Sequence, residues 1–599
     1  MTQNSIPRPE YPRPQFVREN WLNLNGAWQF EIDAGDSGIH RGLKDKKLSG
    51  EILVPFCPES KLSGVEYVDF MPAVWYRREV KIPAAWKKYP RLRLHFQACD
   101  YETTVWVNGS EVARHRGGFT PFFAEIGHLV KPGGKAQIVV RARDDNRIAK
   151  ASGKQSNSYG NAGCHYTRTT GIWQTVWLEP LPETAMERPR ITPELGNLRF
   201  HVEIPLSGPT AGKRVTAILK DSKGEIVRTE VAADSDFSAM LDLPIPEKRL
   251  KLWGPGKPNL YDIIFELRDS EGNLVDSLTS YAGMRSIVID GFAVKINGVS
   301  VFQRQVLDQG YYPDGLMTAP TDAALVKDIK LALDAGFNSA RLHEKVFEER
   351  FLYHADRLGY PVWAEFADWG VRHRHEFSNP VEHQPMASLM AQWQEALIRD
   401  YSHPSIIGWC PLNETAHNIG DAPEAMDDLT HGLYYATKAC DRTRPVIDAS
   451  GYSHRVTGAD IYDSHHYEQN VEKFRADHAG LAEGKPFINS YGEGNIWNIP
   501  YGGQPYFCSE FGGIWWSPEA KKDEDSWGYG IRPKTLEEFY ARFEGLCGVL
   551  LENPRMFGYC YTQLTDVFQE QNGIYTFDRR KKFDMKRIRA AQTRKAAIE

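Results

Sequence analysis

Hydrophobic and polar residues alternate in short runs through the first part of the chain, and this pattern predicts β-strands. The runs 91–96 and 104–107 alternate in this way, and turn pairs such as Asn108-Gly109 and Gly133-Gly134 separate such runs. Several short strands at this spacing predict an all-β sandwich or jelly roll over residues 1–183.

Residues 184–284 continue the alternating pattern. The runs 214–219 and 261–267 are strand-like, and turn residues follow at 222–224 and 271–273. About 100 residues in about seven strands predict an immunoglobulin-like β-sandwich. Neither of these first two regions clusters ionisable residues in a way that suggests chemistry, so we expect them to serve as scaffold and accessory surface.

The pattern changes in the region 285–599, where apolar strand-like runs alternate with segments of helical periodicity. Helices are predicted over 322–333, 346–358, 386–401, 425–439 and 535–551. The eight predicted strands are 301–306, 337–343, 361–366, the run before Glu414, 446–449, 461–464, the run before Glu510, and 556–563. Eight strands in this length predict a C-terminal (β/α)8 TIM barrel, and a doubly wound open sheet is the alternative.

Composition and charge narrow the function classes. A net charge of −6 provides no overall basic field, so we expect no nucleic-acid partner. No apolar run approaches the roughly 18 residues that a membrane span needs. The first seven residues are polar and lack the apolar core of a signal peptide, so we expect a cytoplasmic protein, or a periplasmic or secreted one whose signal has been removed. Cys410, Cys508 and Cys560 lie inside apolar runs and are expected to be buried core residues.

Candidate chemistry lies where the predicted barrel strands end, because the carboxyl ends of barrel strands form one mouth. Polar side chains at these ends are His343, Glu365 or Asp368, Asn413, Glu414, Asp448, His465, His466, Tyr467, Glu510 and Gln563. Glu414 ends the fourth strand and Glu510 the seventh, so both would point into the mouth. Two carboxylates suit glycosidic bond cleavage, in which one protonates the leaving oxygen and the other offers electron density to the anomeric carbon.

Other chemistries have weaker support. A metal site could draw on His465 or His466 near Asp463, but neighbouring strand residues point to opposite faces and no HxxxH or HExxH motif occurs. We therefore expect no required metal. The chain also lacks the GxSxG motif of serine hydrolases and the GxGxxG motif of dinucleotide sites.

Motifs along nearly the whole chain resemble those of one enzyme family. They are the opening Trp-Leu-Asn-Leu-Asn-Gly-Ala-Trp-Gln-Phe at 21–30, Val-Trp-Val-Asn-Gly at 105–109 with Gly-Gly-Phe-Thr-Pro-Phe at 117–122, Gly-Ile-Trp-Gln-Thr-Val-Trp-Leu-Glu at 171–179, the segments 252–261 and 281–285, Asn413-Glu414, and Ser-Glu-Phe-Gly at 509–512. Together they resemble glycoside hydrolase family 2, the group of β-galactosidases, β-glucuronidases and β-mannosidases.

The resemblance implies a sugar-binding-type jelly roll at the N-terminus and a retaining double displacement on a carbohydrate substrate, without a cofactor. Glu510 would be the nucleophile and Glu414 the acid/base, while Asn413 would hydrogen-bond the sugar 2-hydroxyl. Tyr467 would lie near the nucleophile and His343 near the glycone. The remaining candidate substrate-binding residues are Trp369, Trp516, Gln563 and Asp308.

Two departures from the family pattern concern the substrate. The usual Ser-His-Tyr-Pro after the second strand is Leu-His-Glu-Lys-Val at 342–346, and the Asn-Lys pair that binds the sugar carboxylate in glucuronidases is not evident, since 571–575 lack lysine. The expected activity is therefore β-galactosidase-like, with a galactofuranosidase or arabinosidase as alternatives and a β-glucuronidase ranked lower. A catalytically silent carbohydrate-binding protein is the alternative from another class. A homo-oligomer is compatible with all of these.

Overall fold

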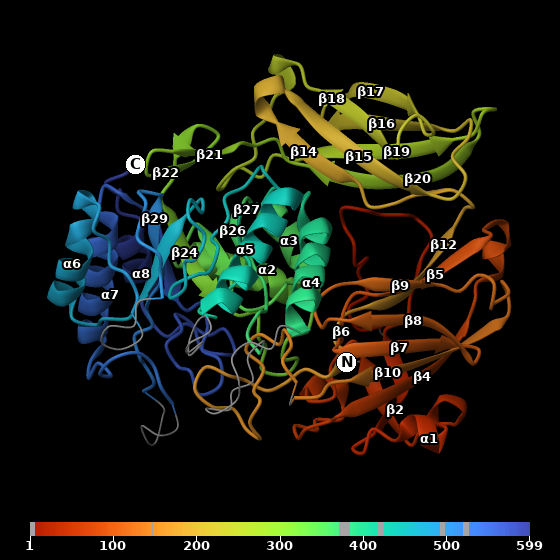
Figure 1. The fold of residues 1–599 in the computed structure, drawn as a ribbon, viewed down its shortest axis with the longest axis horizontal. Helices are drawn as coiled ribbons and strands as arrows, with labels where there is room; N and C mark the ends of the chain where they lie inside the picture. The colour runs from red at the N-terminus through yellow and green to blue at the C-terminus, as the bar shows by residue number, and fades with distance from the viewer. Residues whose placement is uncertain (1–5, 147, 371–383, 416–422, 491–496, 519–525) are drawn as a thin grey trace.

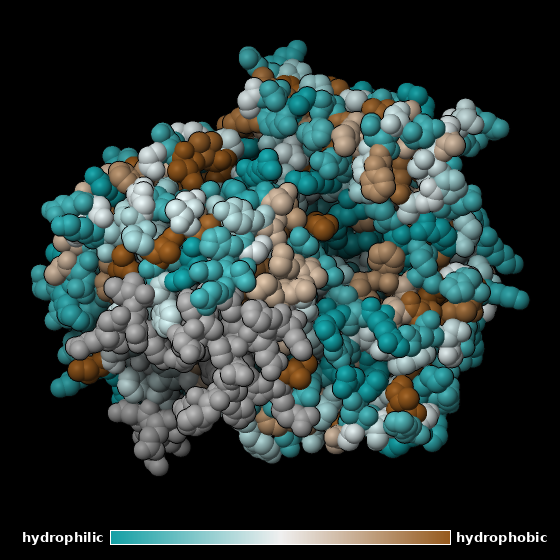
Figure 2. Space-filling view, in the orientation of Figure 1, coloured by the Kyte–Doolittle hydropathy of each residue, from teal (hydrophilic) through white to brown (hydrophobic). Residues whose placement is uncertain are grey.

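The computed structural model describes residues 6–146, 148–370, 384–415, 423–490, 497–518 and 526–599. Two β-sandwiches precede a barrel of parallel strands, and Figure 1 shows the first sandwich (red to orange) and the second (yellow) on one side of the barrel (green to blue). Hydrophilic residues predominate on the face in Figure 2, where hydrophobic residues occur in small separate groups.

The first sandwich contains a four-stranded sheet, β1-β12-β5-β9, and a six-stranded sheet, β3-β2-β4-β10-β7-β8. The strands, with β6 and β11 as a separate pair, are β1 (Leu22–Asn23), β2 (Gly26–Ile32), β3 (Gly50–Val54), β4 (Ala73–Lys81), β5 (Arg91–Phe96), β6 (Cys99–Asp100), β7 (Glu102–Val107), β8 (Ser110–Arg116), β9 (Phe122–Glu125), β10 (Lys135–Arg143), β11 (Gly171–Ile172) and β12 (Val176–Leu181). The core between the sheets contains Leu94, Val105 and Ile138, all fully buried. Asn108 and Gly109 have φ of +50° and +83°, and they connect β7 and β8 as the predicted hairpin turn.

The second sandwich pairs β15 with β13, β14 and β18 in one sheet and orders the other as β17-β16-β19-β20. The strands are β13 (Ala185–Met186), β14 (Arg190–Glu194), β15 (Arg199–Ser207), β16 (Arg214–Asp221), β17 (Gly224–Ala232), β18 (Ser238–Pro244), β19 (Tyr261–Arg268) and β20 (Leu274–Ala282). A small sheet of β21 (Ile287–Asp290), β22 (Ala293–Ile296) and β23 (Val299–Ser300) leads into the barrel. The domain boundaries after 183 and 284 stay predictions.

The barrel strands run in the order β27-β26-β25-β24-β30-β29-β28, and every pair is parallel. They are β24 (Gln303–Asp308), β25 (Ser339–Leu342), β26 (Val362–Glu365), β27 (Ile406–Cys410), β28 (Tyr462–His466), β29 (Tyr506–Gly512) and β30 (Met556–Thr562). Because the first strand pairs with the last, the sheet curls into the predicted barrel and the doubly wound alternative is wrong.

Two strand predictions need correction. The segment 446–449 joins β27 through isolated parallel bridges, Trp409 with Val446 and Asn413 with Ser450, and does not form a regular ladder in the described structure. The first strand begins at Gln303, two residues later than predicted, and residues 299–300 before it form β23, which pairs with β22.

The helices are α1 (Gly38–Arg41), α2 (Asp322–Asp334), α3 (Glu349–Leu358), α4 (Gln384–Asp400), α5 (Pro423–Cys440), α6 (Val471–Ala479), α7 (Leu536–Leu551) and α8 (Met585–Gln592). The Thr321 side chain caps α2 as predicted, accepting a hydrogen bond from Ala324 N, and Gly336 follows the helix with φ +95°. Helix α3 begins three residues later than predicted because its N-cap, Glu348, is extended. None of the helices in the described ranges is both long and apolar enough to cross a membrane.

An N-terminal segment, residues 6–18, contacts all three parts of the molecule. Phe16 is buried in the core of the second sandwich, and Arg18 binds Asp276 of β20 and Glu179 of β12. Arg8 forms an ion pair with Glu348 at the start of α3. This segment therefore connects the sandwiches to the barrel.

Candidate active site

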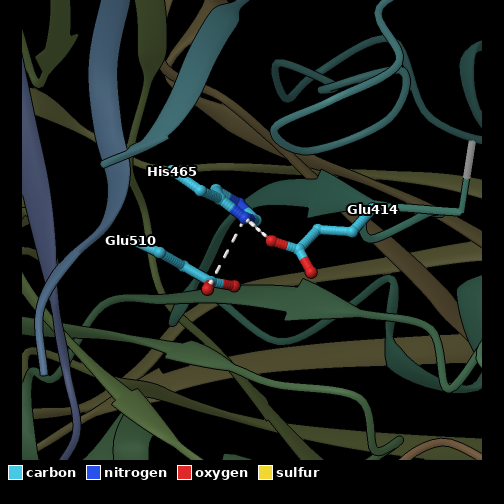
Figure 3. Close-up of side chains that lie close together, drawn as sticks. All are labelled: Glu414, His465 and Glu510. Atoms are coloured by element: carbon cyan, nitrogen blue, oxygen red, sulfur yellow. Dashed lines mark hydrogen bonds and ion pairs between the residues drawn. The ribbon is translucent and has the colours of Figure 1, made fainter. Parts of the chain in front are cut away.

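Glu414 and Glu510 lie together at the barrel mouth with His465 between them (Figure 3). His465 Nδ1 hydrogen-bonds Glu414 Oε1 and lies 3.5 Å from Glu510 Oε2. One oxygen of each carboxylate and the imidazole nitrogen all lie within 4.8 Å of one another. Retaining glycosidases hold their two carboxyl groups about 5 to 5.5 Å apart, and inverting enzymes about 6.5 to 9.5 Å apart. The short separation therefore fits a retaining mechanism.

Two hydrogen-bond donors hold the Glu510 carboxylate. Arg341 Nη1 donates to Oε1 at 3.0 Å, and the Tyr467 hydroxyl donates to Oε2 at 2.5 Å. Tyr467 is itself fixed by stacking on Tyr529, with ring centroids 3.4 Å apart. These contacts orient the carboxylate and stabilise its negative charge, as a nucleophile requires.

The position of one proton follows from the contacts of His465. Asp463 accepts a hydrogen bond from Ser450 Oγ at 2.6 Å, so the Ser450 oxygen is left to accept from His465 Nε2, 2.8 Å away. With Nε2 protonated, the short Nδ1 contact needs a second proton, carried either by Nδ1 or by Glu414. Burial lowers the pKa of His465, but the nearby Glu510 and Glu414 outweigh it and raise the pKa. Glu414 and His465 therefore share a proton, which suits an acid/base.

Asn413 precedes Glu414 and offers one unused donor. Its Oδ1 accepts from Arg341 Nη2 at 2.5 Å and its backbone oxygen accepts from Trp369 Nε1 at 2.7 Å, while Nδ2 is buried with no partner among the described residues. Asp368 accepts from Asn413 N at 2.9 Å and from the Thr415 hydroxyl. A buried amide donor without a partner beside the acid pair is available to a sugar hydroxyl.

His343 lies on the opposite side of Glu510 from His465. Its Nδ1 is 2.9 Å from Glu365 Oε1 and 3.9 Å from Glu510 Oε1. Burial, reinforced by the Lys154 ammonium, holds the pKa of His343 well below its usual range. His343 is therefore neutral near the acid pair, where the sequence predicts it.

Three other predicted binding residues lie farther from the acid pair. Gln563 belongs to a buried network with Gln309 and Asn572 at the barrel edge. Asp308 accepts from Gly310 N at 2.9 Å, and burial together with Asp328 raises its pKa to about 7. The Trp516 ring packs on Phe539 and Phe583. The described contacts of Asp308 and Trp516 are thus with residues other than the two glutamates.

Most of the residues predicted from their position at strand ends lie together in the structure, but that prediction missed two features of the site. The first is Arg341, which lies inside β25 and binds Glu510, Asn413 and Glu365 at once. A lone arginine in an apolar strand was the available signal, since such a buried charge needs partners inside the barrel. His465 faces the acids while His466 stacks on Phe487, as strand alternation predicts.

The second feature is a loop of the first sandwich, residues 148–170, which we call the crossing loop. At one end, Lys150 N donates to Gly370 O and Ser152 N and Gly153 N donate to Trp369 O, at 2.9, 2.8 and 3.0 Å. At the other end, Trp527 Nε1 and Gln569 Nε2 donate to Gly163 O at 2.8 and 2.6 Å. The loop thus spans the barrel mouth. No local pattern in the sequence marks it, because its role depends on the docking of two domains.

A cation is the other ligand that this site could hold. The only group of three potential ligands found in the described ranges is Glu414, His465 and Glu510. The expectation that no metal is required stays a prediction. The ion pair of Glu510 with Arg341 and the Tyr467 hydrogen bond already satisfy the carboxylate on one side.

Family models match most of the chain. The family 2 glycosyl hydrolase sugar binding domain matches residues 22–179, the family 2 model matches 184–285, and the family 2 TIM barrel domain matches 318–498. The chain belongs to glycoside hydrolase family 2. It is a glycoside hydrolase with the family's jelly roll, immunoglobulin-like domain and TIM barrel. Glu414 lies inside the third match and Glu510 lies beyond it.

Relatives within the family share about a quarter of their residues with this chain. A β-glucuronidase from Paenibacillus borealis is 25% identical over 437 residues, covering 68% of this chain and 69% of that protein. The β-glucuronidase of Canis lupus familiaris is 26% identical over 473 residues, covering 73% and 69%. A β-galactosidase from Thermoanaerobacter pseudethanolicus is 24% identical over 392 residues, covering 63% and 48%.

Solved structures of family members share the fold. The β-D-glucuronidase of Dictyoglomus thermophilum superposes with a TM-score of 0.76 at 21% identity, covering 98% of both chains. A Ruminococcus gnavus β-glucuronidase superposes with a TM-score of 0.78 at 19% identity, covering 98% of this chain and 99% of that one.

Proposed function

We propose that the protein is a retaining exo-glycosidase that removes a non-reducing terminal sugar, with Glu510 as nucleophile and Glu414 as acid/base. The observation that carries the proposal is the group Glu414, His465 and Glu510, whose facing atoms lie within 4.8 Å of one another. Glu510 attacks the anomeric carbon while Glu414 protonates the leaving oxygen, and a glycosyl ester of Glu510 forms. Glu414 then takes a proton from water, which attacks the same carbon and releases Glu510.

The surrounding residues support each step. Arg341 and Tyr467 hold Glu510 in place before attack and receive its carboxylate again on release. His465 shares the proton that Glu414 gives and later recovers. The free Asn413 Nδ2 supports the predicted hydrogen bond to the sugar 2-hydroxyl, an interaction that contributes most when it strengthens in the transition state.

The activities of the relatives indicate which terminal sugar this protein could remove. Most of those reported above are β-glucuronidases, which favours a β-glucuronide over the β-galactoside that the sequence ranks first. A β-galactoside is the second candidate, because one relative is a β-galactosidase and the barrel lacks the lysine of the glucuronidase-type pair. Galactofuranosides and arabinosides stay predictions. Membership of a hydrolase family and the presence of both carboxylates disfavour the catalytically silent alternative.

Aryl glycosides test this proposal. We expect the wild-type protein to cleave at least one of the 4-nitrophenyl glycosides in a panel of galacto, glucurono, manno, galactofurano and arabino configurations. The anomer of the released sugar, followed by NMR, is expected to match that of the substrate. Glu510→Ala is expected to lose turnover by at least about 10⁴-fold while remaining folded, as measured by circular dichroism.

Glu468→Gln is the matched control, since Glu468 is one residue from Tyr467 but its carboxylate pairs with Lys473 at the surface. It should keep wild-type turnover. Full activity of Glu510→Ala would refute the nucleophile, and inversion of the anomer would refute the double displacement.

A further inference from the structure

Lys154 brings a positive charge from the crossing loop to the acid pair. Its ammonium lies 3.9 Å from the centroid of the Trp369 ring, and the side chain is 6% exposed. The Trp369 indole donates to the backbone oxygen of Asn413, so the ring lies against the residue before Glu414. The charge of Lys154 also acts on Glu510 and His343. A side chain of the first domain thus reaches the barrel's candidate site.

The position of Lys154 is built into the docking of the loop. Gly153, immediately before it, has φ +58° and donates to Trp369 O and Ala367 O at 3.0 and 3.1 Å. A Cβ at this position would lie 2.1 Å from Glu344 O, so only glycine permits the approach. On the other side, Lys154 O accepts from Tyr166 N at 2.8 Å. The backbone on both sides of the lysine is therefore held.

The neighbouring acids leave the Lys154 charge without a direct partner. No ion pair of its ammonium with a carboxylate occurs among the described residues, although Cys164, Glu570, Glu510 and Glu344 are near enough to act on it electrostatically. Burial raises the pKa of Glu344 and of Glu570, which favours their neutral forms. Glu510 is already paired with Arg341 at 3.0 Å. A buried ammonium in this state favours an anionic ligand.

The barrel edge beside Lys154 offers no cation of its own among the described residues 569–572. Here Asn572 bonds Glu570 at 3.1 Å and Gln563 at 2.8 Å, and the Tyr166 hydroxyl bonds Glu570. These are the positions where the glucuronidase-type lysine is missing from the sequence. The cation that the barrel lacks is thus supplied from another domain.

We propose that Lys154 is a specificity-determining residue of the glycone site, and that its ammonium binds the carboxylate of a uronic acid glycone. This inference rests on the proposed glycosidase function. In this proposal, residues of both the crossing loop and the barrel determine the substrate specificity. The carboxylate would pair with the ammonium on the side away from the indole, and the Trp369 face would remain beneath the cation.

Paired substrates and paired variants test the inference. The substrates are 4-nitrophenyl β-D-glucuronide and 4-nitrophenyl β-D-galactoside, which share a leaving group while only the first carries a carboxylate. Lys154→Met removes the charge at similar length, and Lys154→Arg keeps it. For Lys154→Met we expect kcat/KM to fall about 10- to 100-fold on the glucuronide, the loss of one hydrogen bond between charged groups, and less than about threefold on the galactoside. Lys154→Arg is expected to recover part of the loss, and thermal unfolding verifies that both variants fold.

The outcomes separate this inference from the proposed function. Equal losses on both substrates, or a wild type that cleaves neutral glycosides and not the glucuronide, would overturn the role of Lys154 and leave the glycosidase intact. A wild type that cleaves no glycoside would refute the proposed function. In that case calorimetric titration with D-glucuronate still tests Lys154, since binding by the wild type must weaken at least tenfold in Lys154→Met and an unchanged affinity overturns the inference.

Discussion

Replacement of Gly153 by alanine tests whether the crossing loop belongs to the active site. The backbone at φ +58° costs an alanine about 1 to 2 kcal/mol. The added Cβ would also lie 2.1 Å from Glu344 O, and because this atom is backbone no side-chain rotation can relieve the contact. Undocking the loop end would instead give up the backbone donors of Lys150, Ser152 and Gly153, about 3 kcal/mol at about 1 kcal/mol each. Because the backbone contact cannot relax, we expect release of the loop to cost less free energy than keeping the alanine in the docked position.

We therefore expect Gly153→Ala to withdraw Lys154 from the mouth. On 4-nitrophenyl β-D-glucuronide, kcat/KM should fall at least about tenfold, since one charged contact is lost. Trypsin should cut the released loop at Lys154, where the wild type is buried. Gly160→Ala is the matched control, because Gly160 lies in the same loop and a methyl group added there would have no atom within 4 Å. If Gly153→Ala keeps both wild-type kcat/KM and wild-type resistance to trypsin, the reasoning about the loop is wrong.

Three further changes probe the acid/base, a buried acid and the domain junction. Glu414→Gln should lose far more kcat/KM on aryl glycosides with poor leaving groups than on dinitrophenyl glycosides, because only the former need a proton; a rate series of aryl substrates measures this. Burial raises the pKa of Asp368 from 3.8 to about 7, so its contribution to stability is present below about pH 4 and is lost as pH rises through 7. Asp368→Asn should remove about 3 kcal/mol of the loss between pH 5 and pH 8, at about 1.4 kcal/mol per pH unit up to the folded pKa of about 7, measured by urea unfolding at these two pH values. Glu179→Gln leaves buried Arg13 without its ion-pair partner and buried Arg18 with Asp276 alone, and should cost about 3 to 5 kcal/mol of unfolding free energy.

Controls accompany these changes. Glu111→Gln breaks only an exposed pair with Arg114 and should alter stability by less than about 1 kcal/mol. Equal losses of Glu414→Gln across leaving groups would contradict its role as the acid. An unchanged pH dependence in Asp368→Asn would show that this carboxyl does not cause the loss.

The architecture followed from local patterns because each domain repeats one kind of element. Alternation in the sandwiches and the strand-helix order after residue 300 are local properties, and the hairpin at Asn108 and the cap at Thr321 depend on residues within three positions. Strand bounds were less predictable because strand pairing is tertiary: the first barrel strand begins at Gln303 rather than Val301, and the segment 446–449 joins β27 only through isolated bridges.

The part of the candidate site that is formed by the ends of the barrel strands could be predicted from the sequence. Glu414, Glu510, Asn413, His343 and Tyr467 lie together because parallel strands end at one mouth. Strand position did not show that the described contacts of Asp308 and Trp516 would be with residues other than the acid pair.

Arg341 and Lys154 lie near the acid pair although the sequence did not predict them as site residues. Arg341 points inward from within a strand, where its partners come from two other strands, β26 and β29, and from Asn413 after β27. Lys154 belongs to the first domain, which the sequence analysis predicts to be scaffold. Its contact with Trp369 joins residues 215 positions apart in the chain, which no local sequence pattern can reveal.

The N-terminal segment has a consequence for folding during synthesis. Arg8 pairs with Glu348, and Phe16 completes the core of a sandwich whose strand β20 ends at Ala282. The ribosome makes the segment before its partners, which emerge hundreds of residues later. The first sandwich can therefore fold early, whereas the segment can dock fully only after the second sandwich and helix α3 of the barrel have been made.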